Sequence, residues 1–96
     1  MIVNNLELRL LENVLDSLDR LFDCDSQAVD VYALLFATAE ALLETSHYQL
    51  LDETTKKLDA LLKAAETKNE LREAALIETN KLRHYIAKLL PPFVNS

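Results

Sequence analysis

The sequence contains no glycine, and its two prolines, Pro91 and Pro92, stand together near the C-terminus. Glycine supplies the positive φ angles that tight β-hairpins and phosphate-cradling loops require. Its absence counts against hairpins, a P-loop and the phosphate-binding turn of a dinucleotide-binding fold. The dominant residues are instead leucine, alanine, glutamate, lysine and aspartate, which are mostly good helix formers. The composition therefore predicts an all-α protein.

Cysteine is almost absent as well, since Cys24 is the only one and cannot form an internal disulfide. Nothing in the cysteine content points to an oxidising compartment. Residues 1–4 lack the basic segment that opens a secretory signal. The longest uncharged run in the middle of the chain, residues 31–39, is far shorter than the roughly 20 residues that span a bilayer. We expect a cytoplasmic protein without a membrane partner.

Basic residues are scarce in the first half of the chain. Residues 1–45 carry nine acids and two bases, whereas residues 46–96 carry seven acids and eight bases, and the net charge is −6. Affinity for a phosphate backbone comes from clustered Lys and Arg, so we expect no nucleic-acid partner. An acidic half suits a basic protein partner, or serves only to keep the chain soluble.

Periodicity and capping residues predict four amphipathic helices, at about residues 5–22, 26–45, 47–66 and 68–90, followed by an apolar tail at 91–96. Capping boxes are expected at residues 46–49 and 67–70, and Asp25 or Ser26 is expected to cap the second helix. Pro91 should end the fourth helix, because proline disfavours helical geometry in the residue before it.

Every junction between these helices is short, so consecutive helices should lie antiparallel. The prediction is a single domain, an antiparallel up-down four-helix bundle, with two hairpins paired or exchanged in a homodimer as the alternative. Glu78 falls within the inner stripe of the fourth helix and would need a partner if buried. The expected core consists of Leu11, Leu15, Leu18, Leu35, Leu42, Leu58, Leu62, Leu82, Ile86 and Leu89.

Five aspartates gather around the first junction: Asp16, Asp19, Asp23, Asp25 and Asp30. Asp19 and Asp23 are expected at the C-terminal end of the first helix, where the helix dipole disfavours negative charge. A residue placed against its local preference is a hint of function. These aspartates, the acidic patch below, are predicted to dock a basic partner. The competing interpretation is a solvated turn with a capping aspartate.

The second predicted helix is apolar nearly all round. Val31 and Leu35 lie on one side of it, and Val29, Phe36 and Leu43 lie on the other. No helix is central in a four-helix bundle, so part of this surface is a candidate interface. The predicted apolar binding face consists of Val29, Tyr32, Phe36 and Leu43.

No residue pattern predicts a metal, a cofactor or catalysis. A calcium loop starting at Asp23 would need a glycine and a glutamate where Ala28 and Leu34 stand. His47 and His84 are too far apart in sequence for a local zinc-binding pair. We therefore expect no enzyme activity.

Two functions are consistent with these features. The first is a small acidic protein–protein interaction module that binds or neutralises a basic partner, in the manner of an immunity or antitoxin-like inhibitor, a comparison that rests on size and charge alone. The alternative is a structural subunit or chaperone-like adaptor that forms a homodimer, or docks a partner, through the apolar face of the second helix.

Overall fold

The computed structural model describes residues 5–23, 27–64 and 67–90. They form four α-helices: α1 (Asn5–Phe22), α2 (Ala28–Ala41), α3 (Tyr48–Ala64) and α4 (Lys68–Leu89). This part of the chain contains no β-strand, and none of its helices is both long and apolar enough to cross a bilayer. The all-α prediction is confirmed.

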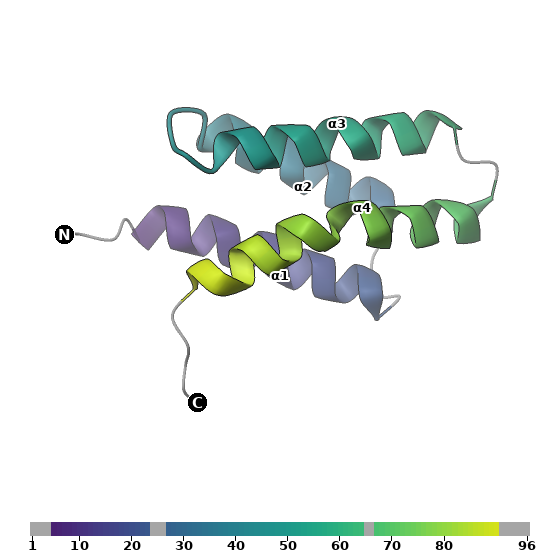
Figure 1. The fold of residues 1–96 in the computed structure, drawn as a ribbon, viewed down its shortest axis with the longest axis horizontal. Helices are drawn as coiled ribbons and strands as arrows, with labels where there is room; N and C mark the ends of the chain where they lie inside the picture. The colour runs from purple at the N-terminus through teal and green to yellow at the C-terminus, as the bar shows by residue number, and fades with distance from the viewer. Residues whose placement is uncertain (1–4, 24–26, 65–66, 91–96) are drawn as a thin grey trace.

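The helices alternate in direction along the bundle (Figure 1). Each one packs against its neighbours in sequence, and α4 returns to pack against α1. Within the described residues, α1 and α3 lie on one diagonal and do not touch, while α2 and α4 approach each other across the other diagonal. This is the antiparallel up-down four-helix bundle that the short junctions predicted.

The core runs through all four helices and contains most of the predicted residues. Leu15 and Leu62 are only half-buried at its edge, and Leu89 is wrongly predicted, since it is 40% exposed. In α1 the buried stripe includes Val14 and Leu21, because this helix faces α2 and α4 together. The buried apolar residues are Leu11, Val14, Leu18, Leu21, Ala28, Val31, Leu35, Ala39, Leu42, Leu51, Leu58, Ala75, Leu82 and Ile86.

Both ends of α4 follow the sequence prediction. The Thr67 hydroxyl accepts a hydrogen bond of 3.0 Å from the backbone N–H of Glu70, which satisfies one of the free amides of the first turn. At the other end, Leu90 leaves helical geometry with φ −73° and ψ 141°, as expected for the residue before a proline.

The junction between α2 and α3 differs from the prediction, because α2 ends at Ala41 and α3 begins at Tyr48. The Thr45 hydroxyl donates to the Leu42 carbonyl at 2.8 Å and accepts from the His47 N–H at 3.2 Å. A threonine that bonds the backbone in this way competes with the helical ladder. It therefore builds a turn where the sequence predicted a capping box at residues 46–49. The N-cap of α2 is Gln27, and not Asp25 or Ser26 as predicted, because the helix begins at Ala28. The tail at 91–96 lies outside the described residues.

The outer side of α3 is a solvated, charge-paired surface. Lys56 lies 3.0 Å from Asp52 and Lys63 lies 3.0 Å from Asp59. Hydrogen bonding to these carboxylates raises the pKa of both lysines above the ordinary lysine value. Exposed pairs of this kind in the i,i+4 relation contribute little to stability, because water screens the charges.

Candidate functional site

The predicted apolar binding face is exposed in the structure. Val29 is 49% exposed, Phe36 53% and Leu43 52%, whereas Tyr32 is half-buried. The rings of Tyr32 and Phe36 stack with their centroids 6.3 Å apart and an interplanar angle of 28°. We call these four residues the α2 outer face.

The spacing of these residues places them along one side of the helix. Val29 and Phe36 are seven residues apart, which is close to two helical turns, so their side chains follow one line along α2. Leu43 extends this line into the turn after the helix. The opposite side of α2 carries Val31, Leu35 and Ala39, all buried in the bundle. One helix thus provides part of the core and an uncovered apolar surface.

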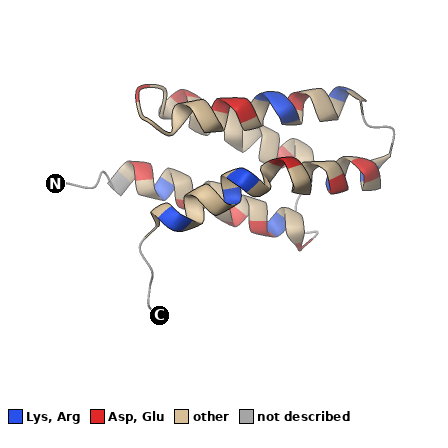
Figure 2. Ribbon diagram, viewed as in Figure 1, with Lys and Arg blue, Asp and Glu red and all other residues tan. Residues whose placement is uncertain are grey.

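The charge near this face has one sign. The sequence has no lysine or arginine between Arg20 and Lys56, and α2 carries no basic residue (Figure 2). Its exposed charged residues are Asp30 and Glu40, and Glu44 is exposed in the following turn. The α2 outer face is therefore bordered by carboxylates.

On α3, the basic residue close to the α2 outer face is Lys63, which interacts electrostatically with Tyr32. Its ammonium is bound to Asp59 at 3.0 Å, so its charge is already compensated. This pairing reduces the positive charge that Lys63 adds near the face.

The acidic patch is partly neutralised within the chain. Asp16 pairs with Arg20 at 3.2 Å on the exposed side of α1. Asp19 pairs with Arg83 of α4 at 2.9 Å through Oδ1. That oxygen is buried and accepts no hydrogen bond, so the charge of Arg83 is what compensates it.

The other two described aspartates of the patch, Asp23 and Asp30, lie on different parts of the chain. Asp23 is exposed at the end of α1. Asp30 lies in the first turn of α2, where its Oδ2 accepts from the Gln27 N–H at 3.1 Å. Asp30 thus supports the N-cap residue Gln27, whereas the sequence predicted Asp25 or Ser26 as the cap of this helix. Asp25 lies outside the described residues.

Two arginines of α4 were not singled out from the sequence. The Arg72 side chain donates to the carbonyls of Leu21, at 3.3 Å, and Phe22, at 2.7 Å, so it caps the C-terminal end of α1. The Arg83 guanidinium lies 5.5 Å from the centre of the Phe22 ring. These contacts join residues fifty or more positions apart, and no local sequence signal could have predicted them.

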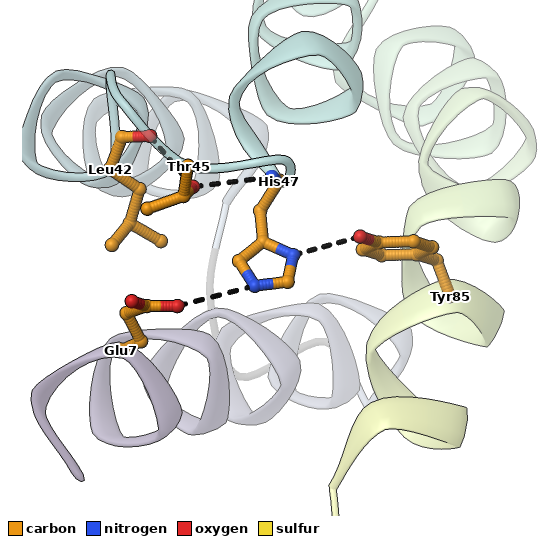
Figure 3. A network of polar contacts seen from close by, with 5 residues as sticks. All are labelled: Glu7, Leu42, Thr45, His47 and Tyr85. Carbon is orange, nitrogen blue, oxygen red and sulfur yellow. Dashed lines mark hydrogen bonds and ion pairs between the residues drawn. The ribbon is translucent and has the colours of Figure 1, made fainter. Parts of the chain in front are cut away.

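A polar network joins three parts of the chain at the opposite end of the bundle (Figure 3). His47 Nδ1 and the Tyr85 hydroxyl are 2.8 Å apart, in a hydrogen bond whose direction depends on the tautomer of the ring. His47 Nε2 lies 3.4 Å from Glu7 Oε1. The turn before α3 is thus linked to α1 and to α4.

This network has the character of a structural contact. The His47 side chain is 15% exposed and that of Glu7 30%. No three His, Cys, Asp or Glu residues of the described chain lie together in a way that could hold a metal ion.

Glu78, the other candidate for a special polar role, pairs with Lys57 at 3.7 Å.

A shallow hollow of about 180 Å³ lies between the end of α1 and the starts of α2 and α4. Arg72 lines it, but its guanidinium is already bonded to the carbonyls of α1. Arg72 therefore acts in this hollow as a contact between α4 and α1. Its lining consists of Leu21, Gln27, Ala28, Lys68, Asn69, Leu71 and Arg72.

Comparison with models of protein families, with curated proteins and with solved structures finds no match for this chain. No activity or partner is therefore carried over from a relative. The surfaces described above are the remaining guide to function.

Proposed function

We propose that this chain is a protein-binding module and that its binding surface is the α2 outer face. The observation that carries the proposal is that Val29 and Phe36 on α2, and Leu43 in the turn after it, are each about half exposed. Apolar surface left uncovered in this continuous form is typical of interaction sites. Aromatic residues such as Tyr32 and Phe36 are enriched at the centres of interfaces.

Other exposed apolar residues are more scattered. Leu6 is 63% exposed on α1 and Ile77 is 72% exposed on α4, but single residues of this kind are ordinary on protein surfaces. Phe22 is 57% exposed, and the guanidinium of Arg83 lies close to its ring. The α2 outer face differs because its members repeat along a helix and two of them stack.

A second candidate function is the neutralisation of a basic partner, as an immunity or antitoxin-like inhibitor does. The absence of lysine and arginine between Arg20 and Lys56 favours it. Because Asp16 and Asp19 already have arginine partners, we assign this role to the carboxylates that border α2. The single cysteine gives no reason for an oxidising compartment, so the cytoplasm is the proposed location.

The proposal is tested by site-specific photo-crosslinking in the native cell. A photoreactive phenylalanine analogue replaces Phe36 in one variant and Ile77 in a matched control, since both side chains are more than half exposed. We expect a discrete crosslinked product from position 36 and none from position 77. Equal products from the two positions, or none from position 36, would contradict the proposal.

A further inference from the structure

We propose that the partner of the α2 outer face is an amphipathic helix of another protein, with Lys or Arg residues flanking its apolar side. This inference rests on the proposed function and adds the chemistry of the partner. A helix that lays its apolar side on such a surface is a common mode of recognition. The choice of this occupant comes from the charge around the face and from the strength that binding requires.

The first argument is charge complementarity. Asp30, Glu40 and Glu44 are exposed beside the apolar residues, and α2 has no base that could pair with them. A partner with Lys or Arg at its margins would place opposite charges there and would associate faster at low salt. A partner with acidic margins would meet like charges instead.

The second argument weighs against a second copy of this chain. An antiparallel twofold pairing centred on Phe36 would place Val29 over Leu43 of the other copy. It would also bring Asp30 near Glu44 of the other copy, because Asp30 directly follows Val29 and Glu44 directly follows Leu43. Juxtaposed like charges across an interface are costly. The same carboxylates that attract a basic helix therefore oppose self-association.

The third argument is one of magnitude. Val29, Phe36 and Leu43 are each about half exposed, so a partner that covers them removes only part of their apolar surface from water. Association also has to offset the translational and rotational freedom that two molecules lose when they bind. The apolar residues alone do not offset this cost, so the charged border has to contribute to recognition.

The test uses three synthetic helical peptides that share one leucine-rich side. Their flanking residues are lysine, glutamine or glutamate, and each peptide carries a fluorescent label. Binding is measured by anisotropy at low and at physiological ionic strength. We expect the lysine peptide to bind at least about tenfold more tightly than the glutamate peptide at low salt, and this preference to shrink as salt rises.

Matched variants test whether the lysine peptide binds at the α2 outer face or is attracted only by the net charge of −6. Glu40→Lys should weaken binding of the lysine peptide severalfold, whereas Glu73→Lys, which makes the same charge change at an exposed position of α4, should not. Phe36→Ser should abolish binding, whereas Ile77→Ser should leave it unchanged. Circular dichroism of each variant confirms that the helices are intact.

The outcomes distinguish this inference from the proposed function. Equal binding of the lysine and glutamate peptides, lost on Phe36→Ser, would overturn the basic partner and leave the α2 outer face as the binding surface. Binding of the lysine peptide that survives Phe36→Ser would overturn both. Absence of binding by every peptide, or dimerisation in sedimentation experiments that Phe36→Ser removes, would overturn the basic helix as the occupant.

Discussion

Two arginines of α4, Arg72 and Arg83, set the electrostatics of the last turn of α1. A helix ends in carbonyls without partners and carries partial negative charge there, so Asp19 is unfavourably placed within its own helix. Arg83 pairs with Asp19, and Arg72 donates to two of the terminal carbonyls. The local penalty is thus compensated by groups from another helix, and the position of Asp19 gives no evidence of a binding role.

The Arg72 contact gives a prediction about stability. Arg72→Met keeps much of the aliphatic stem and removes the two hydrogen bonds to the carbonyls of Leu21 and Phe22. We expect a loss of about 1–2 kcal/mol in the free energy of unfolding, measured by urea denaturation. Lys81→Met, at an exposed position of the same helix, is the control and should change stability by less than about 0.5 kcal/mol. An equal effect of the two substitutions would argue against the capping role.

At the scale of the element, the helices of this protein begin in different ways. Thr67 caps α4 through its side chain. Before α3, Thr45 bonds the last turn of α2, and Ser46 stands exposed in the turn. Two sequences that each fit a capping box therefore have different outcomes, because a nearby threonine competes for the backbone at one of them.

This difference can be measured with one substitution at each site. Thr67→Ala should destabilise the protein by about 1 kcal/mol, since the N–H of Glu70 loses its acceptor. Ser46→Ala should be neutral within about 0.5 kcal/mol, since α3 begins two residues later. Thermal denaturation of both variants, with Thr67→Ser as a conservative partner, tests this. A larger loss from Ser46→Ala than from Thr67→Ala would restore the capping box first predicted at residues 46–49.

At the same scale, the helix α2 contributes to the core with one side and to the exposed surface with the other. Val31 and Leu35 anchor it in the core, so its register and orientation are fixed by the bundle. Val29 and Phe36 lie on the outer side of the helix, so their exposure does not disturb the packing of the core. A surface presented by a packed helix loses little conformational freedom on binding, which favours its use as a docking site.

The whole molecule is a ring of helices closed where α4 meets α1. Arg72 joins these two helices at the end of α1, Arg83 pairs with Asp19 further along α4, and the network of Glu7, His47 and Tyr85 links them near the start of α1. Between these ends the apolar core is continuous through all four helices. Stability should therefore depend most on residues in the middle of the bundle.

Two leucines test this distribution. Leu58 of α3 is fully buried, whereas Leu89 at the end of α4 is 40% exposed. Leu58→Ala should cost about 2–5 kcal/mol, because it removes buried surface and leaves a cavity, and Leu89→Ala should cost less than about 1 kcal/mol. Guanidinium denaturation gives both values. A comparable loss at the two positions would mean that the core reaches the end of α4.

The composition and the periodicity of the sequence were sufficient for the fold class. The lack of glycine, the stripes of leucine and the short junctions predict four antiparallel helices, because local propensity and patterning act within a few turns of chain. The start of α4 at Thr67 and its end before Pro91 followed from the same local rules. The exposed α2 outer face was also predicted, since one helix of a four-helix bundle cannot bury apolar residues on all sides.

The environment of the charged residues depended on the tertiary structure. Asp16 has its partner within its own helix, but Asp19, Glu7 and Glu78 find theirs on other segments of the chain. The rotation of α1 that buries Val14, and the exposure of Leu89, also depended on the tertiary structure. Such contacts depend on the register and rotation of packed helices, to which residues far apart in the chain contribute together. The sequence by itself therefore determined four helices and one uncovered apolar face, while the packing of α4 against α1 decided that Asp19 pairs with Arg83.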